Sequence, residues 1–282
     1  MLTVRKSRAS SLITSLSVLG GGAIGVLLLT PEAKAATLSF SESTFVFSNF
    51  SISPLDTTAE AITSTLTVSR NGIVEATANA QSIFVTPLLS PASAFNFVSS
   101  LTTGEGLDYF GTADTYARVV GDFDIASGET FSFDFTGSIV LTTQIEIQEF
   151  EAASALANIN FNLSTLMDDG SVGTSLDRLN LLAFLNTSGL DNYSSEKTDA
   201  ISFNSFNTSQ SSESLTEFFL AQFSGTFRRF FPQATKVQLS ETKAGLVSIS
   251  ASPYAVPEPL TILGSLLAVG IGGILRKEYY KT

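Results

Sequence analysis

The 282-residue chain contains no cysteine, no histidine and no tryptophan. Without cysteine there is no disulfide, no thiol nucleophile and no thiol for lipid attachment. Without histidine there is no Ser-His-Asp triad, and zinc and haem sites built on their usual ligands are excluded. No Walker loop and no G-x-S-x-G motif occurs, and Gly104-Glu105-Gly106 lacks the third glycine of a dinucleotide-binding loop. These absences exclude most familiar classes of active site.

Carboxylate chemistry survives this exclusion, because two Asp or Glu side chains about 5–10 Å apart suffice for a glycosidase. The candidates are Glu105, Asp108, Asp122, Asp124, Asp134, Glu146 and Glu149. Each of them also fits a solvent-facing strand position or a turn, and no tryptophan is present to serve as a sugar platform. We therefore expect no catalytic residues and rank a carboxylate-pair glycosidase third among the functions.

Calcium is the next possibility for the acidic residues, since it binds oxygen ligands. Asp122-Phe123-Asp124 and Asp168-Asp169 could each supply carboxylates, but neither follows an EF-hand or nonapeptide pattern. Aspartates of this kind also occur simply because their side chains stabilise turns. We expect no cofactor and keep calcium as the alternative.

The N-terminus has the layout of a secretory signal peptide. Arg5, Lys6 and Arg8 precede an apolar core at residues 12–29, and Ala33-Lys34-Ala35 follows with small residues at the −3 and −1 positions of a cleavage site. Cleavage after Ala35 by signal peptidase would divide residues 1–35 from the rest. The pattern predicts export through the secretion machinery.

The C-terminus has three parts: Val256-Pro257-Glu258-Pro259, an apolar run at residues 260–275, and a basic tail at 276–282 that begins with Arg276 and Lys277. As a helix, the apolar run would be about 24 Å long. A bilayer core is about 30 Å thick. Lysine and arginine side chains at the end can extend to the headgroups and make up the difference. The segment is thus expected to span the membrane with its basic end in the cytoplasm.

This order of motif, apolar span and basic end resembles the PEP-CTERM sorting signal of exported bacterial proteins. The resemblance implies that a membrane-embedded protease of the exosortase type recognises Val256, Pro257, Glu258 and Pro259 and removes the tail. It also implies transient anchoring in the inner membrane, followed by release to the cell surface or the extracellular matrix, with exopolysaccharide as a candidate partner.

The body between the two ends, residues 36–255, is strongly acidic. It keeps 8 of the 15 basic residues and 23 of the 26 acidic ones, which gives a formal charge of −15. Such a charge repels phosphate groups, so we expect no nucleic-acid partner.

Alternation of apolar and polar residues with a period of two predicts an all-β body. Asn71-Gly72 is the strongest short signal for a hairpin turn. The expected strands are residues 37–50 with a register change after Phe40, 63–70, 73–85, 118–125, 130–147, 158–166, 179–185, 201–206, 218–231, 236–241 and 245–251. Ten to twelve short strands indicate an antiparallel β-sandwich or a jelly-roll-like double sheet.

Five segments carry weaker expectations. Residues 149–157 are rich in helix-forming Ala and Glu, and Ser214 to Glu217 fits a capping box, although the aromatic run after it suits a strand equally. We expect mobile loops at 186–199 and 204–214. Arg228-Arg229 is interpreted as the charged protection of an edge strand.

Together these patterns predict an exported, non-catalytic structural or interaction protein of the cell surface or extracellular matrix. A carbohydrate-binding module, calcium-dependent or not, is the alternative, because exposed Tyr, Asn, Ser and Thr also suit sugars.

Overall fold

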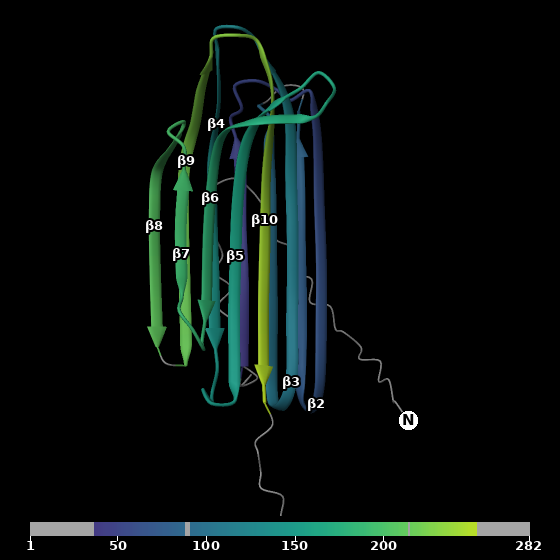
Figure 1. The fold of residues 1–282 in the computed structure, drawn as a ribbon, viewed down its shortest axis with the longest axis vertical. Helices are drawn as coiled ribbons and strands as arrows, with labels where there is room; N and C mark the ends of the chain where they lie inside the picture. The colour runs from purple at the N-terminus through teal and green to yellow at the C-terminus, as the bar shows by residue number, and fades with distance from the viewer. Residues whose placement is uncertain (1–36, 88–90, 214, 253–282) are drawn as a thin grey trace, which may run out of the picture. The chain divides into compact units, whose positions relative to one another are not determined.

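Ten antiparallel strands account for most of the chain that the computed structural model describes, which is residues 37–87, 91–213 and 215–252 (Figure 1). The strands are β1 (Thr37–Ser48), β2 (Asp56–Val85), β3 (Ser93–Ile125), β4 (Glu129–Gln144), β5 (Glu151–Leu166), β6 (Val172–Asn186), β7 (Asn192–Lys197), β8 (Ile201–Glu213), β9 (Thr216–Phe231) and β10 (Thr235–Ala251). The all-β, antiparallel expectation is confirmed. The predicted signal peptide and C-terminal span lie outside the described residues.

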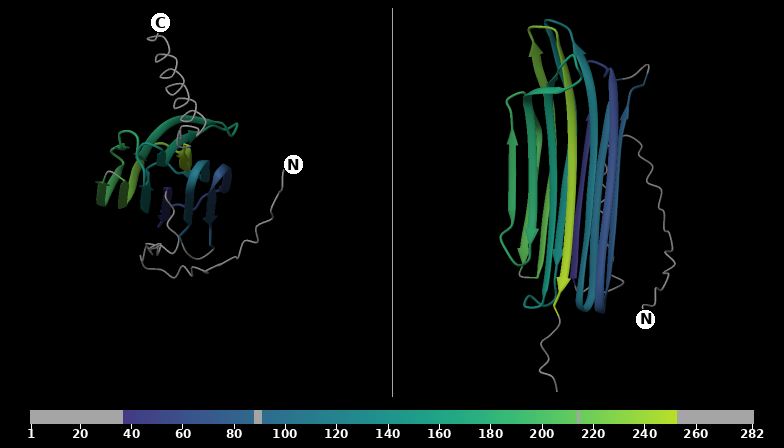
Figure 2. Two further views of the ribbon diagram at one scale, coloured as in Figure 1. Left: turned by 90° about the horizontal axis from the view of Figure 1, so that it is seen from below. Right: turned by 45° about the vertical axis from the view of Figure 1, so that its right-hand side comes forward.

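The strands form one sheet in the order β7-β6-β5-β10-β3-β1-β4-β9-β8, and β2 pairs with β3. Strand β3 has a different neighbour along each half. Residues 94–104 pair with β1, and residues 109–125 pair with β10. The green strand β8 and the blue strand β2 lie at opposite sides of the view (Figure 1), and in the right-hand view of Figure 2 the green and the blue strands again lie at opposite sides.

The long β2–β3 ribbon folds back on itself. Ser82 Oγ donates to the carbonyl oxygen of Glu60 at 2.8 Å, and the hydroxyls of Ser100 and Thr115 lie 2.9 Å apart. The bend passes through Asn71-Gly72 on β2 and residues 105–108 on β3. Each half of the ribbon therefore belongs to a different layer of the sheet.

Asn71-Gly72 thus marks a chain reversal, but the predicted hairpin across it is wrong. The two flanking segments pair with β3 and not with each other. The positive φ angles at the bend belong to Gly106 (88°) and Asp108 (55°) on the neighbouring strand. Glycine is needed at position 72 for close approach, because a Cβ there would lie 2.5 Å from the carbonyl oxygen of Glu105.

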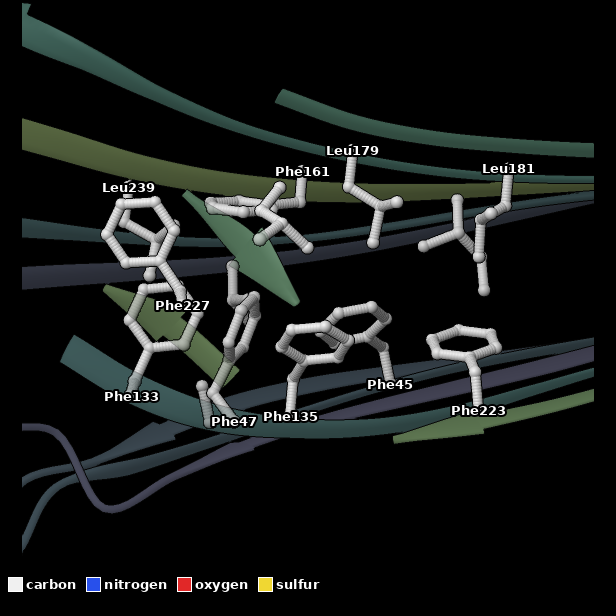
Figure 3. Packing of buried hydrophobic residues seen from close by; sticks show 14 of the residues in the cluster. Phe45, Phe47, Phe133, Phe135, Phe161, Leu179, Leu181, Phe223, Phe227 and Leu239 are labelled. Carbon is white, nitrogen blue, oxygen red and sulfur yellow. The ribbon is translucent and has the colours of Figure 1, made fainter. Parts of the chain in front are cut away.

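The core lies between the two layers and is built largely from phenylalanine. Phe161 of β5, Leu179 of β6 and Leu239 of β10 come from one layer, and Phe45, Phe135 and Phe223 come from the other (Figure 3). The rings of Phe133 and Phe227 stack with centroids 4.8 Å apart. Aromatic rings bury much apolar area and hold specific geometries, so this cluster stabilises the layers in one arrangement.

Two predictions about the strands, a register change in β1 and a break in β10, are wrong because part of the interior is polar. Strand β1 has no register change: Thr37, Ser39, Ser41 and Ser43 are buried on the same face as Phe45 and Phe47, and Leu38 and Phe40 lie on the other face. Likewise the predicted strands 236–241 and 245–251 are one strand, β10, whose charged middle faces inward. The charged residues Glu241 and Lys243 interrupt the apolar alternation, so the sequence pattern suggested two strands where the structure has one.

The other local expectations also need correction. Residues 149–157 form a turn and the start of β5, where Ala153, Ala155 and Ala157 are buried, so packing overrides helix propensity. Strand β9 begins at Thr216, inside the proposed capping box, and continues through the aromatic run; Ser214 itself lies outside the described residues. The segments expected to be loops contain β7 and β8.

None of the described residues forms a helix with the length and apolar character needed to span a membrane.

Candidate functional site

The predicted processing residues lie outside the part of the chain that the structure describes. These are Ala33 and Ala35 at the N-terminus and Val256, Pro257, Glu258 and Pro259 at the C-terminus. The structure therefore bears on the body alone.

The predicted carboxylates are distributed over four places in the fold. Glu105 and Asp108 lie at the bend of β3, Asp122 and Asp124 lie further along β3 with their side chains away from the core, Asp134 lies on β4, and Glu146 and Glu149 are exposed before β5. Asp134 accepts a hydrogen bond from Asn49 Nδ2 at 2.7 Å. These carboxylates therefore lie on the outer surface of strands or in turns, as the alternative interpretation expected.

Three of the four aspartates considered for calcium, Asp122, Asp168 and Asp169, accept hydrogen bonds from other side chains. Lys236, directly opposite Asp124 in the sheet register, donates through Nζ to Asp168 Oδ1 at 3.1 Å. Asp122 accepts from Gln238 Nε2 at 2.9 Å, and Asp169 accepts from the Ser171 hydroxyl at 2.6 Å. Within the described ranges, no three acidic side chains gather closely enough to hold a metal.

The first feature that suggests a function is the free edge of β2. This strand pairs with β3 along its length and with no other described strand. Its apolar side chains Ile62, Leu66 and Val68 are each more than half exposed. Proteins usually protect such an edge with lysine, proline or a bulge. Residues 56–85 contain neither lysine nor proline, and their pairing with β3 runs without a register shift.

The second feature is a group of buried polar side chains between the layers, beside the phenylalanine cluster. From β1, Ser39 Oγ and Ser41 Oγ donate across the interior to carbonyl oxygens of Ser154 and Leu156 on β5. Tyr109 donates through its hydroxyl to Thr37 Oγ1 at 2.6 Å. The first half of β1 is thus held to the opposite layer by hydrogen bonds and not by apolar packing.

Lys243, Glu241 and Asn96 form the centre of this polar group, and all three are buried. Lys243 Nζ donates to Glu241 Oε1 at 2.7 Å, and Asn96 Nδ2 donates to Glu241 Oε2 at 2.5 Å. The ammonium also lies 5.2 Å from the centre of the Phe45 ring, a cation–π contact. One carboxylate therefore bridges an amine on its own strand and an amide on the opposite layer.

Burial shifts both charged groups toward their neutral forms. It lowers the pKa of Lys243 to about 8, against the opposing attraction of Glu241. It raises the pKa of Glu241, although Lys243 and Asn96 act in the other direction. Two more atoms of this region, Ser43 Oγ and Asn96 Oδ1, are buried with no hydrogen-bond partner among the described residues. Unpaired buried polar atoms are costly, so these two atoms lower the stability of the region.

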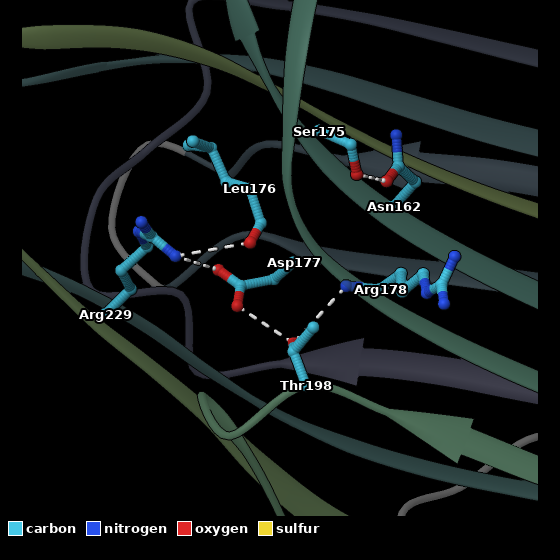
Figure 4. A network of polar contacts seen from close by, with 7 residues as sticks. All are labelled: Asn162, Ser175, Leu176, Asp177, Arg178, Thr198 and Arg229. Carbon is cyan, nitrogen blue, oxygen red and sulfur yellow. Dashed lines mark hydrogen bonds and ion pairs between the residues drawn. The ribbon is translucent and has the colours of Figure 1, made fainter.

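A third polar group joins the layers on the far side of the core (Figure 4). Arg229 Nη1 of β9 donates to Asp177 Oδ2 and to the carbonyl oxygen of Leu176, both on β6, and Thr198 donates to Asp177 Oδ1. The interpretation of Arg228-Arg229 as edge protection is wrong, since β9 lies between β4 and β8.

Sequence reasoning missed the Lys243 group because Asn96 and Glu241 are 145 positions apart in the chain. The signal that could have indicated it is the unusual run of buried-face residues in β1, where serine replaces the expected apolar residues. Comparisons with known proteins give no further guide: no family model matches the chain, and neither curated proteins nor solved structures provide a match.

Proposed function

We propose that this chain is an exported, non-catalytic structural protein of the cell surface or extracellular matrix, and that its body associates with further copies through the edge of β2. The signal-peptide pattern and the Val256–Pro259 motif support the export route. The free edge of β2 supports the association. Strand addition to such an edge gives affinity through backbone hydrogen bonds and specificity through alternate side chains.

The sequence of β2 favours a second copy as the occupant of this edge. Two copies of residues 60–70 that pair antiparallel about Thr65 bring Glu60 opposite Arg70 of the second copy, twice by symmetry. The same register brings Ile62 opposite Val68. Opposite charges and apolar pairs at facing positions both stabilise antiparallel strands. The edge is thus complementary to itself.

A charge swap tests this association in the purified mature protein. Arg70→Glu sets like charges against each other at both facing pairs, so light scattering should report dissociation. Adding Glu60→Arg to the same chain restores opposite charges and should restore the assembly. Leu190→Lys, at a residue 90% exposed and outside β2, is the control that should leave assembly unchanged. If the unmodified protein, Arg70→Glu, the double variant and Leu190→Lys all assembled equally, β2 would not form the interface.

A carbohydrate-binding module is the second candidate, which the predicted link to exopolysaccharide favours. A glycan array with and without chelator separates the two. Specific glycan binding by the Arg70→Glu variant, with no self-association in the unmodified protein, would favour the module.

A further inference from the structure

The interior of the sheet holds an amine and an amide on the same carboxylate. Lys243 and Glu241 lie on β10, and Asn96 lies on the first half of β3, in the opposite layer. From this geometry we propose that Lys243 and Asn96 react with each other to form an amide bond between the two layers, with Glu241 transferring the proton.

The Lys243 amine is held by two contacts, one with the Phe45 ring and one with the Glu241 carboxylate. Its nitrogen lies over the Phe45 ring, and Phe45 is the residue directly opposite Asn96 in the pairing of β1 with β3. The Glu241 carboxylate holds Nζ by one oxygen and the Asn96 amide by the other. Two reacting groups held in this way need no diffusional encounter, which removes much of the entropic barrier of an amide-forming reaction.

The surroundings also supply the protonation states that the reaction needs. An amine attacks only when it is neutral, and burial lowers the pKa of Lys243 to about 8 while it raises the pKa of Glu241. Transfer of one proton along the 2.7 Å hydrogen bond converts the ion pair into a neutral amine and a carboxylic acid. Neutral groups cost less to bury at this site than charged ones.

Asn96 has the group that such an acid would activate. Its Oδ1 is buried and has no partner among the described residues. A half-turn of the amide lets Oδ1 accept a hydrogen bond from protonated Glu241, and this polarises the Cγ–Oδ1 bond. Nζ then attacks Cγ with its lone pair.

The step balances without an oxidant, a reductant or a co-substrate. The Cγ–Nζ bond forms, and the Cγ–Nδ2 bond breaks. Starting from the neutral amine and the protonated carboxyl, one proton from Nζ passes through Glu241 to Nδ2, which leaves with its bonding electrons as ammonia. Glu241 ends this step as the carboxylic acid with which the step began, and it becomes a carboxylate again when it gives up the proton that it first took from the ammonium. The covalent change is the loss of one ammonia molecule.

Peptide mapping of the purified full-length protein or its naturally processed form tests the bond. Trypsin cuts after lysine and arginine, so the unreacted chain yields residues 71–118 and residues 237–243 as separate peptides. The bond joins these segments, blocks cleavage after Lys243 and removes the mass of one ammonia. We expect the joined peptide to predominate. Recovery of residues 237–243 in full yield as a free peptide would overturn the proposal.

Variants identify the reacting atoms. Asn96→Asp should still join the segments but lose water in place of ammonia, and Glu241→Gln should leave both peptides free. Asn71→Ser is the matched control, because backbone attack on the side chain of Asn71, before Gly72, also releases ammonia and lies in the same peptide. An ammonia loss that disappears with Asn71→Ser, or a water loss that links Lys243 to Glu241, would contradict the proposal. The map of the unmodified protein decides the matter even where a variant fails to fold.

Discussion

Arg229 and Asp177 join the two layers through a 2.8 Å hydrogen-bonded ion pair in which the aspartate side chain is 4% exposed. The pair lies between β6 and β9, away from the folded β2–β3 ribbon that connects the layers on the other side. Removing the arginine leaves a buried carboxylate that keeps only its hydrogen bond from Thr198.

Arg229→Ala should therefore lower the free energy of unfolding by about 2 kcal/mol, since an unpaired buried charge is costly and the arginine itself is partly exposed. Urea denaturation measures the change. Arg178→Ala is the matched control: Arg178 and its partner Glu196 are both more than 60% exposed, and such pairs contribute about 0–1 kcal/mol. Equal losses in the two variants would contradict the assigned role.

The phenylalanine core gives a second prediction. Phe133 stacks on Phe227 and meets Phe47 edge-on at 5.3 Å. Phe133→Ala should lower the free energy of unfolding by about 3–5 kcal/mol, because it removes buried area and leaves a cavity. Phe230→Ala should change it by less than about 0.5 kcal/mol, since Phe230 is 60% exposed. Thermal and urea unfolding of both variants measure the difference in stability between the buried and the exposed substitution.

Stability should fall with rising pH because of Glu217. Burial raises the pKa of this carboxyl above 4.5 and Asp191 adds to the shift, although the Thr143 hydroxyl opposes it. Between 4.5 and the raised value, the folded state binds more protons than the unfolded state, so the free energy of unfolding decreases as pH rises. Glu217→Gln removes this titration. We expect the unfolding free energy of this variant to fall less than that of the unmodified protein from pH 4.5 to neutrality. If the two plots of unfolding free energy against pH were parallel, Glu217 would not be the source of the pH dependence.

Processing at the C-terminus is predicted to depend on Glu258. Glu258→Ala leaves the apolar run at 260–275 intact, so membrane insertion should continue while release is blocked. Mass spectrometry of the released fraction shows whether the tail has been removed. A mature protein that still carries residues 260–275 would identify the segment as a permanent anchor. Glu278→Ala, beyond the apolar run, is the control that should be released normally.

Sequence reasoning succeeded where the interior is apolar. Strand β9 and the second half of β5, residues 158–166, alternate regularly, because every second residue meets the core. It failed where a buried face carries polar residues, as at Ser41 and Lys243, because a period-two pattern assumes that buried means apolar. The fold-back of the ribbon was also missed, since Asn-Gly indicates a reversal but not whether the two arms lie side by side or face to face.

The candidate site was beyond prediction for a related reason. Lys243 and Glu241 are recognisable as charges within a strand, but their burial depends on the pairing of β10 between β3 and β5. Asn96 meets them only because β3 changes layers at its bend. Long-range topology, and not local pattern, brings these three side chains together. The export and sorting motifs, in contrast, are local and stay predictions.

The position of β10 also determines when this chain can finish folding. It is the last of the described strands in sequence order, yet it lies between β5 and β3. During synthesis from the N-terminus, β5 and the second half of β3 each keep an unpaired edge until residues 235–251 emerge. Such non-local pairing is slow and leaves aggregation-prone strands exposed. The growing chain is therefore expected to need a holding chaperone until its last strand arrives.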